Sequence, residues 1–157
     1  MNPYPLIDLL SPQRLTEIVD IGANPIDGDP PYLPMLKLGE ICRVTGFEPQ
    51  EAALQKLKNV KSQQEQYLPY VVGDGSEKVL NICCAEGMTS LFKPNKKILE
   101  IFHPFDIWGE ITSQKNVLTR TLDSIDEILE LDYLKIDVQG GELDVFQHGK
   151  KSSLIPF

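Results

Sequence analysis

The sequence KIDVQGGE at residues 135–142 joins an apolar strand to a helix, with two adjacent glycines and two carboxylates at the junction. Junctions of this kind lie at the carboxyl ends of strands, where α/β enzymes have their catalytic and ligand-binding residues. The stretch therefore predicts an α/β fold with a site at the tip of this strand, formed by Asp137 and its neighbours.

Two earlier stretches repeat the same plan. IVDIGAN at residues 18–24 and VTGFEP at residues 44–49 each carry an apolar run that ends near an acid, Asp20 in the first and Glu48 in the second. Three strands with acids at their carboxyl ends indicate a cofactor that contains a nucleoside.

The length and charge of the chain limit the classes of protein to consider. Its 157 residues fit one domain, and 15 Lys and Arg against 23 Asp and Glu give a net charge of −8. That charge disfavours nucleic acids and anionic membranes as partners, and the sequence has no run near the roughly 18 apolar residues of a membrane span. We expect a cytoplasmic protein that acts on a small molecule.

The first half of the chain has an alternating strand and helix pattern. Pro49 opens the clearest helix, in which Ala53, Leu54 and Leu57 recur at helical spacing. The expected elements are strands at 17–21, 43–48 and 67–72 and a short helix at 35–40. This is a βαβαβ beginning, which favours a parallel sheet.

The second half is expected to be locally antiparallel or mixed, because a Gly-Asp-Gly-Ser turn at residues 73–76 separates two apolar runs. The expected elements are strands at 78–85, 117–122 and 132–138 and helices at 94–105, interrupted by Pro104, at 123–131 and at 142–147.

The first two strand ends offer polar groups to a cofactor. Asp20, Gly22 and Asn24 follow the first strand, where Gly22 lets the backbone approach a ligand; Asp20 has the alternative role of capping the next turn. Glu48 ends the second strand, and its two carboxylate oxygens match the 2′ and 3′ hydroxyls of a ribose, with capping again the alternative.

The loop after the first strand is unsuited to phosphates. A dinucleotide site needs the pattern G-x-G-x-x-G, but only Gly22 fits, and Asp27 and Asp29 add negative charge. NAD and ATP are therefore disfavoured, while a cationic cofactor without phosphates, such as S-adenosylmethionine, is compatible with this loop.

Five strings in order resemble the FkbM family of S-adenosylmethionine-dependent methyltransferases. They are DIGAN (20–24), GFEP (46–49), GMTSL (87–91), TLDSI (121–125) and LKIDVQGGE (134–142), and the likeness spans residues 17–150. The resemblance implies a Rossmann-like methyltransferase fold with a mostly parallel central sheet. It also implies methyl transfer to a hydroxyl of a sugar or a secondary metabolite.

The resemblance also assigns roles to residues. It puts Asp20, Gly22 and Asn24 in the first cofactor motif, Glu48 at the ribose, and Asp137 at the strand tip that faces the reactive methyl. Methyl transfer to oxygen needs a base near the hydroxyl. Asp137 is the first candidate, and its alternative role is a carboxylate held by backbone N–H groups of the next helix.

Other candidates each have a structural alternative. Glu142 and His103 are rivals for the base, although His103 in its apolar stretch can be simply packed or exposed. Asp74 can bind adenine or cap its own turn, and Ser90 can line the cleft or close a turn.

The aromatic and histidine residues have alternatives of the same kind. Trp108, with Phe102 and Phe105, can line an apolar pocket or pack in the core. His103 and His148 lack the spacing of metal ligands, so no metal is expected.

The end of the chain departs from the family, whose members continue with further strands. We expect a single methyltransferase-like domain over 1–157, truncated after about residue 150, with its C-terminal strands missing or incomplete. The competing hypothesis is a non-catalytic or fragmentary module that binds a partner or self-associates, and an open sheet edge would favour a homodimer.

Overall fold

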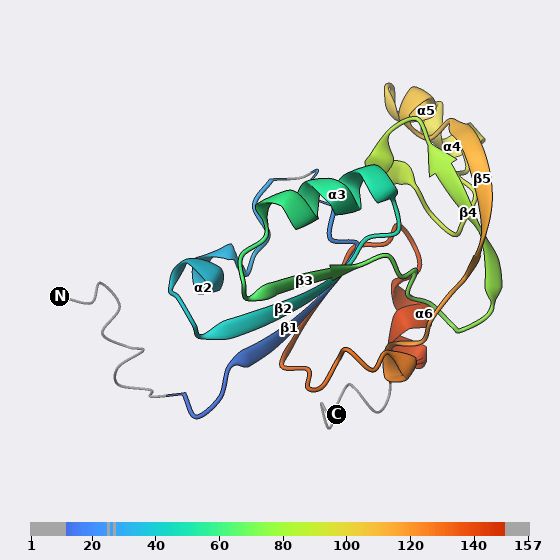
Figure 1. The fold of residues 1–157 in the computed structure, drawn as a ribbon. Helices are drawn as coiled ribbons and strands as arrows, with labels where there is room; N and C mark the ends of the chain where they lie inside the picture. Colours follow the sequence, from blue (N-terminus) through green and yellow to red (C-terminus); the bar gives the residue numbers. More distant parts are fainter. Residues whose placement is uncertain (1–11, 25, 27, 150–157) are drawn as a thin grey trace.

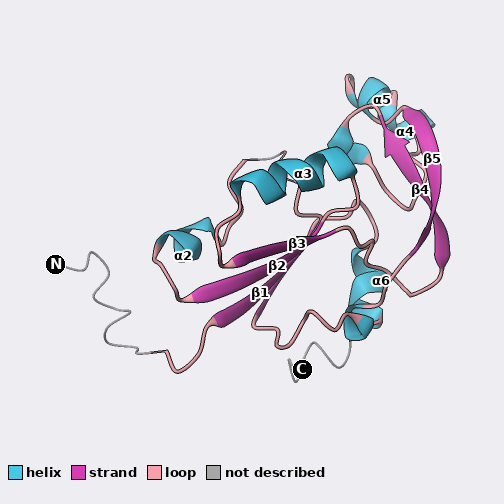
Figure 2. Ribbon diagram, viewed as in Figure 1, coloured by secondary structure: helices cyan, strands magenta, loops and turns pink. Residues whose placement is uncertain are grey.

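Six strands form two separate sheets in the computed structural model, which describes residues 12–149 except 25 and 27. One sheet has four parallel strands in the order β3-β2-β1-β6, and the other is the antiparallel pair β4-β5 (Figures 1 and 2). The α/β class and the mostly parallel, Rossmann-like central sheet are thereby confirmed. Residues 150–157, on which the expected truncated strand falls, lie outside the described residues.

The parallel sheet brings the predicted strand ends to one edge. Its register pairs Asp20 of β1 with Gly46 of β2 on one side and with Lys135 of β6 on the other, so the three strands finish level. The strands are β1 (Thr16–Ile21), β2 (Cys42–Phe47), β3 (Glu65–Leu68) and β6 (Tyr133–Ile136). Within the described part of the chain, β6 is an edge strand.

Side chains of β1 alternate between the two faces of the sheet. Val19 and Ile21 join the larger core cluster, which includes Val145 of α6 (Glu142–Gln147). Ile18 packs instead with Tyr32 near α2 (Leu33–Lys37). Because strand side chains alternate with a period of two, Asp20 shares the α2 face with Ile18.

Helix α3 (Glu51–Val60) covers the sheet beside β3, as Figure 1 shows. Its buried residues Leu54 and Leu57 cluster with Ala23 and Tyr67. The expected helix after Pro49 is confirmed.

The second sheet stands beyond the carboxyl edge of the first (Figure 2). Strand β4 (Glu77–Cys83) pairs with β5 (Ile111–Leu118), and an isolated bridge pairs Val72 with Arg120. The segment between β4 and β5 contains η1 (Glu86–Met88), α4 (Lys96–Leu99) and α5 (Phe105–Trp108). The expected helical stretch at 94–105, interrupted by Pro104, is confirmed in part: α4 lies within it, and α5 begins directly after Pro104.

The expected helix at 123–131 is also wrong. This region contains only the 3₁₀ turn η2 (Leu122–Ser124). Leu122 and Ile125 are buried, and Ile128 packs on the same core cluster. A 3₁₀ turn is usually short, and here Leu122, Ile125 and Ile128 reach the core without the chain continuing as an α-helix.

The limits of β3 and β5 differ most from those expected. Strand β3 ends at Leu68, before Pro69, which cannot donate a backbone hydrogen bond to a sheet. Strand β5 begins at Ile111 and ends at Leu118, so the expected 117–122 strand covers only its last residues.

Candidate functional site

A cavity lies at the carboxyl edge of the parallel sheet. It brings together five of the predicted site residues: Gly22, Asn24, Glu48, Ser90 and Asp137. The apolar part of its wall is made by Ile21, Ile26, Phe47, Tyr70, Val71, Val72, Leu80, Leu91 and Val138. The cavity thus combines an apolar lining with carboxylates from the tips of β2 and β6.

Glu48 is the most unusual of these carboxylates, since it is only 2% exposed. Its Oε1 accepts a hydrogen bond of 2.7 Å from the backbone N–H of Gln50. Burial raises the pKa of Glu48 from 4.5 to about 7, and the charge of Glu86 acts in the same direction, against the backbone hydrogen bonds from Gln50 and Asn24. A buried acid with spare acceptor capacity is suited to binding hydroxyl donors.

Asp137 has a different environment, because it is exposed and lines the edge of the cavity. Its amide donates a 2.9 Å hydrogen bond to the carbonyl oxygen of Ile21, which holds the tips of β6 and β1 together. Gly22, at a φ of +78°, lies directly against the Asp137 carbonyl. An exposed carboxylate on this fixed backbone is available to an incoming group.

The turn after Asp137 is held by Ser90. The Ser90 hydroxyl, which is buried, donates a 2.8 Å hydrogen bond to the carbonyl oxygen of Gln139. Gln139 has a φ of +50° and Gly140 a φ of +94°, so the chain reverses sharply here. The position of Ser90 in the cavity wall is therefore also a structural one.

A second set of contacts closes the cavity on the side of η1. The side-chain Nδ2 of Asn24 donates a hydrogen bond to Glu86 Oε2 at 3.3 Å. Gln50 Nε2 donates to the backbone carbonyl oxygen of Glu86 at 3.3 Å. Asn24 thereby links the loop after β1 to η1 across the cavity.

Asp20 lies outside this cavity, on the opposite face of β1. Its carboxylate is 1% exposed and accepts hydrogen bonds from the Tyr32 hydroxyl at 2.6 Å and from Lys135 Nζ at 2.9 Å. Burial raises the pKa of Asp20, and both partners oppose the rise. Lys135 also donates to the Gly22 carbonyl oxygen at 3.1 Å, so this buried triad holds the tip of β1.

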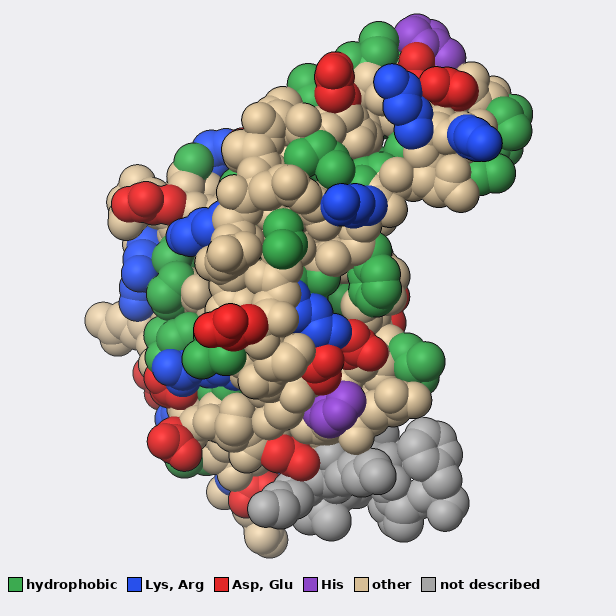
Figure 3. All heavy atoms as spheres, turned by 90° about the vertical axis from the view of Figure 1, so that its right-hand side faces the viewer, with side chains coloured by type: hydrophobic (Ala, Val, Ile, Leu, Met, Phe, Trp, Pro, Cys, Tyr) green, Lys and Arg blue, Asp and Glu red, His purple; other side chains and the backbone are tan. Residues whose placement is uncertain are grey.

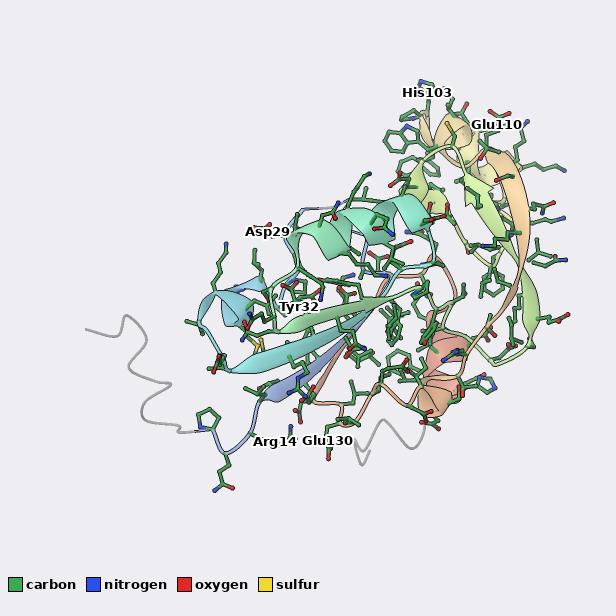
Figure 4. All side chains as sticks on the ribbon, viewed as in Figure 1. Arg14, Asp29, Tyr32, His103, Glu110 and Glu130 are labelled. Atoms are coloured by element: carbon green, nitrogen blue, oxygen red, sulfur yellow. The ribbon has the colours of Figure 1, made fainter. Side chains whose placement is uncertain are left out.

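The remaining candidates also lie away from the cavity. Asp74 caps its own turn through Ser76 and pairs with Lys78 at 2.7 Å, and these contacts hold its pKa well below the usual range. Glu142 accepts from the Gly140 amide at 3.1 Å. His103 is 73% exposed at the outer end of the α4 and α5 segment, where it points away from the sheet (Figure 4).

Several site residues were not predicted. Tyr70 stacks on Phe47 with ring centroids 6.0 Å apart, and Arg120 lies 3.7 Å above its ring. Lys135 had a sequence signal, as a charged residue inside an apolar strand. Tyr32 had none, because its contact with Asp20 depends on the path of the loop.

Some other features are absent from the described ranges. Residues 12–149 without 25 and 27 contain no group of three or more His, Cys, Asp or Glu side chains that could hold a metal ion. Over the same ranges, no helix has the length and apolar character needed to cross a bilayer.

Parallel strands whose acidic tips at Glu48 and Asp137 border one apolar cavity define a Rossmann-like fold with a candidate binding site at its carboxyl edge. Comparison with protein families then identifies the kind of enzyme. The chain belongs to the FkbM methyltransferase family, since the Methyltransferase FkbM domain matches residues 20–155. It is thus an S-adenosylmethionine-dependent methyltransferase. Comparisons with curated proteins and with solved structures give no significant match.

Proposed function

We propose that the cavity binds S-adenosylmethionine and that the protein transfers its methyl group to a hydroxyl of a sugar or secondary metabolite. The observation that carries this proposal is Glu48, a buried carboxylate at the tip of β2 in the wall of an apolar cavity. Its two oxygens can accept hydrogen bonds from both ribose hydroxyls.

The other lining residues fit the rest of the cofactor. Phe47, Tyr70 and Val72 offer an apolar surface to adenine, and Tyr70 is fixed by a 2.8 Å hydrogen bond to Glu127. Gly22 and Asn24 lie where the amino-acid part would bind. The surrounding acids Glu48, Glu86 and Asp137 suit a cofactor with a cationic sulfonium.

Asp20 would act on the cofactor indirectly. Of its two hydrogen-bond partners, Tyr32 and Lys135, Lys135 also donates to the Gly22 carbonyl oxygen, and Gly22 borders the cavity. We therefore propose a positioning role for Asp20.

The bound cofactor supplies an electrophilic methyl group. The acceptor hydroxyl must lie about 3 Å from that methyl and lose its proton. We propose Asp137 as the base, because its carboxylate is exposed at the edge of the cavity on a backbone held by Ile21. Glu142 and His103 lie outside the cavity and are weaker candidates.

Calorimetric titration tests the cofactor assignment. The wild type should bind S-adenosylmethionine and show no binding of NAD. Glu48→Gln should lower the affinity by about 1.5–3 kcal/mol, the range for hydrogen bonds to a charged group. Glu51→Gln, an exposed change in the first turn of α3, is the matched control and should bind normally. Equal affinities for the Glu48→Gln and Glu51→Gln proteins would refute the ribose assignment.

We also propose a cytoplasmic location. Cys42, Cys83 and Cys84 are all free thiols, and Cys83 and Cys84 are adjacent, which fits a reducing compartment. The net charge of −8 supports a small-molecule acceptor over nucleic acid.

A second candidate function is self-association, and the position of β6 favours it. Among the described strands, β6 pairs only with β1, so one of its edges offers backbone N–H and C=O groups. A homodimer would then form through this edge. Light scattering between micromolar and millimolar concentrations tests this: a rising mass supports it, and a constant monomer mass contradicts it.

A further inference from the structure

The segment between β4 and β5 exposes an unusual amount of apolar surface. Seven large apolar side chains between residues 92 and 108 are 42–68% exposed: Phe92, Ile98, Ile101, Phe102, Phe105, Ile107 and Trp108. Figure 3 shows hydrophobic side chains on the projecting upper part of the molecule, which carries α4 and α5. The reading of Trp108, Phe102 and Phe105 as core residues is therefore wrong, and a patch of this kind indicates a binding surface.

The inner end of this segment forms a hollow beside the cofactor cavity. Met88, Phe92, Pro94 and Leu99 make its apolar lining, and Ser90 and Gln139 belong to the walls of both the hollow and the cavity. Ser90 and Gln139 therefore form a wall that the hollow and the cavity share.

Hydrogen bonds fix the hollow relative to Asp137. The Phe92 amide donates to the Ser90 hydroxyl oxygen at 3.0 Å, and that hydroxyl donates to the Gln139 carbonyl oxygen at 2.8 Å. Gln139 is two residues from Asp137 in the chain. The Phe92 ring lies close to the next residue, since a β-carbon added to Gly140 would be 3.7 Å from that ring. A molecule in the hollow would thus lie against the turn that follows the proposed base.

We propose that the hollow binds the apolar part of the methyl acceptor, so that the acceptor is a hydroxyl compound carrying an alkyl chain or a ring system and is not a free sugar. This inference rests on the proposed function. A free sugar carries hydroxyls on every side, so contact with Met88, Phe92 and Leu99 adds little to its binding free energy. An alkyl chain or a ring system binds more favourably, because its apolar surface leaves water.

Two probes that differ only in their apolar part test the inference. Octyl β-glucoside, kept below its micelle concentration, and methyl β-glucoside present the same sugar hydroxyls. By equilibrium dialysis, octyl β-glucoside should bind at least roughly tenfold more tightly, since burial of even a few methylenes has that effect. Equal binding of the two probes would overturn the proposal.

Two variants locate the binding. Phe92→Ser should lower octyl β-glucoside affinity by roughly tenfold, and the change should fold because Phe92 is half-exposed. Leu99→Ser is a second change in the same lining, with thermal unfolding to verify its fold. Leu129→Ser, at a 77% exposed position outside the hollow, is the control and should bind the probe normally. If neither Phe92→Ser nor Leu99→Ser weakens binding, the hollow is not the site.

Cofactor titration of the same proteins separates this inference from the proposed function. Normal S-adenosylmethionine binding with no preference for the octyl probe would overturn only the acceptor class. Failure of the wild type to bind S-adenosylmethionine would overturn the proposed function, and the acceptor assignment with it. A wild-type dimer that dissociates on Phe92→Ser would mean that a second copy covers the patch, which also overturns the assignment.

Discussion

Gly22 lies directly against the carbonyl oxygen of Asp137, so that a β-carbon at position 22 would overlap this oxygen. The contact joins the first cofactor motif to the strand tip that carries the proposed base. It also makes position 22 the most restricted backbone point of the site, because Gly22 has a φ of +78°.

Replacing Gly22 by alanine should destabilise the fold by more than about 3 kcal/mol. The change combines an unfavourable φ with a clash against backbone that is hydrogen-bonded to Ile21 and cannot easily move. Denaturant unfolding measures the loss. Gly39→Ala is the matched control: Gly39 has a φ of +97°, but nothing lies within 4 Å of its β-carbon. It should cost about 1 kcal/mol, and equal losses for the two variants would contradict this account.

Glu48 should make the protein less stable as the pH rises from about 4.5 to about 7. Its pKa is raised to about 7 in the folded state from 4.5, so the folded state holds the proton more tightly than the unfolded state. The contribution of Glu48 to the free energy of unfolding is therefore greatest below pH 4.5 and is lost as the pH rises through 7. The loss amounts to up to roughly 3 kcal/mol. Unfolding at several pH values measures this, and Glu48→Gln should remove this part of the pH dependence. An unchanged pH profile in Glu48→Gln would assign the effect to another group.

Asp137→Asn should keep cofactor binding and lose turnover. Asparagine keeps the shape of the side chain but cannot accept the proton, so turnover of any accepted hydroxyl substrate should fall by roughly 10²-fold or more. Production of S-adenosylhomocysteine and calorimetric cofactor binding measure the two effects separately. Glu142→Gln is the matched control, because Glu142 contacts the Gly140 amide outside the cavity, and it should remain active. Full turnover by Asp137→Asn would exclude Asp137 as the base.

Lys135→Met should be strongly destabilising, by about 3–5 kcal/mol, because it leaves the buried Asp20 carboxylate without its cation. Tyr32→Phe removes only one hydrogen bond to Asp20 and should cost about 1–3 kcal/mol. In an Asp20→Asn background the cost of Lys135→Met should fall, since no buried charge is then left unpaired. Denaturant unfolding of the single and double variants checks this, and simple additivity of the two changes would show that Asp20 and Lys135 are not coupled.

The sequence alone determined the class of fold, the chemistry of the strand ends and the family. Apolar runs ending at Asp20, Glu48 and Asp137 predicted parallel strands with acids at their ends, because such patterns are local and depend on only a few neighbouring residues. Gly22, Asn24, Glu48, Ser90 and Asp137 were all predicted as site residues, and all line one cavity. The cofactor and catalytic roles assigned to them remain predictions.

Only the tertiary structure decided which way these side chains face and what surrounds them. Asp20 lies on the α2 face, where Tyr32 and Lys135, which are 12 and 115 residues away in the chain, supply its hydrogen bonds. The segment 123–131 is not a helix because its apolar residues reach the core from a 3₁₀ turn and loop. The apolar hollow next to Gln139 lies where Ser90, which is bridged to Asn81 of β4, donates a hydrogen bond to the turn after β6. Contacts between such distant segments depend on packing, which no local pattern in the chain specifies.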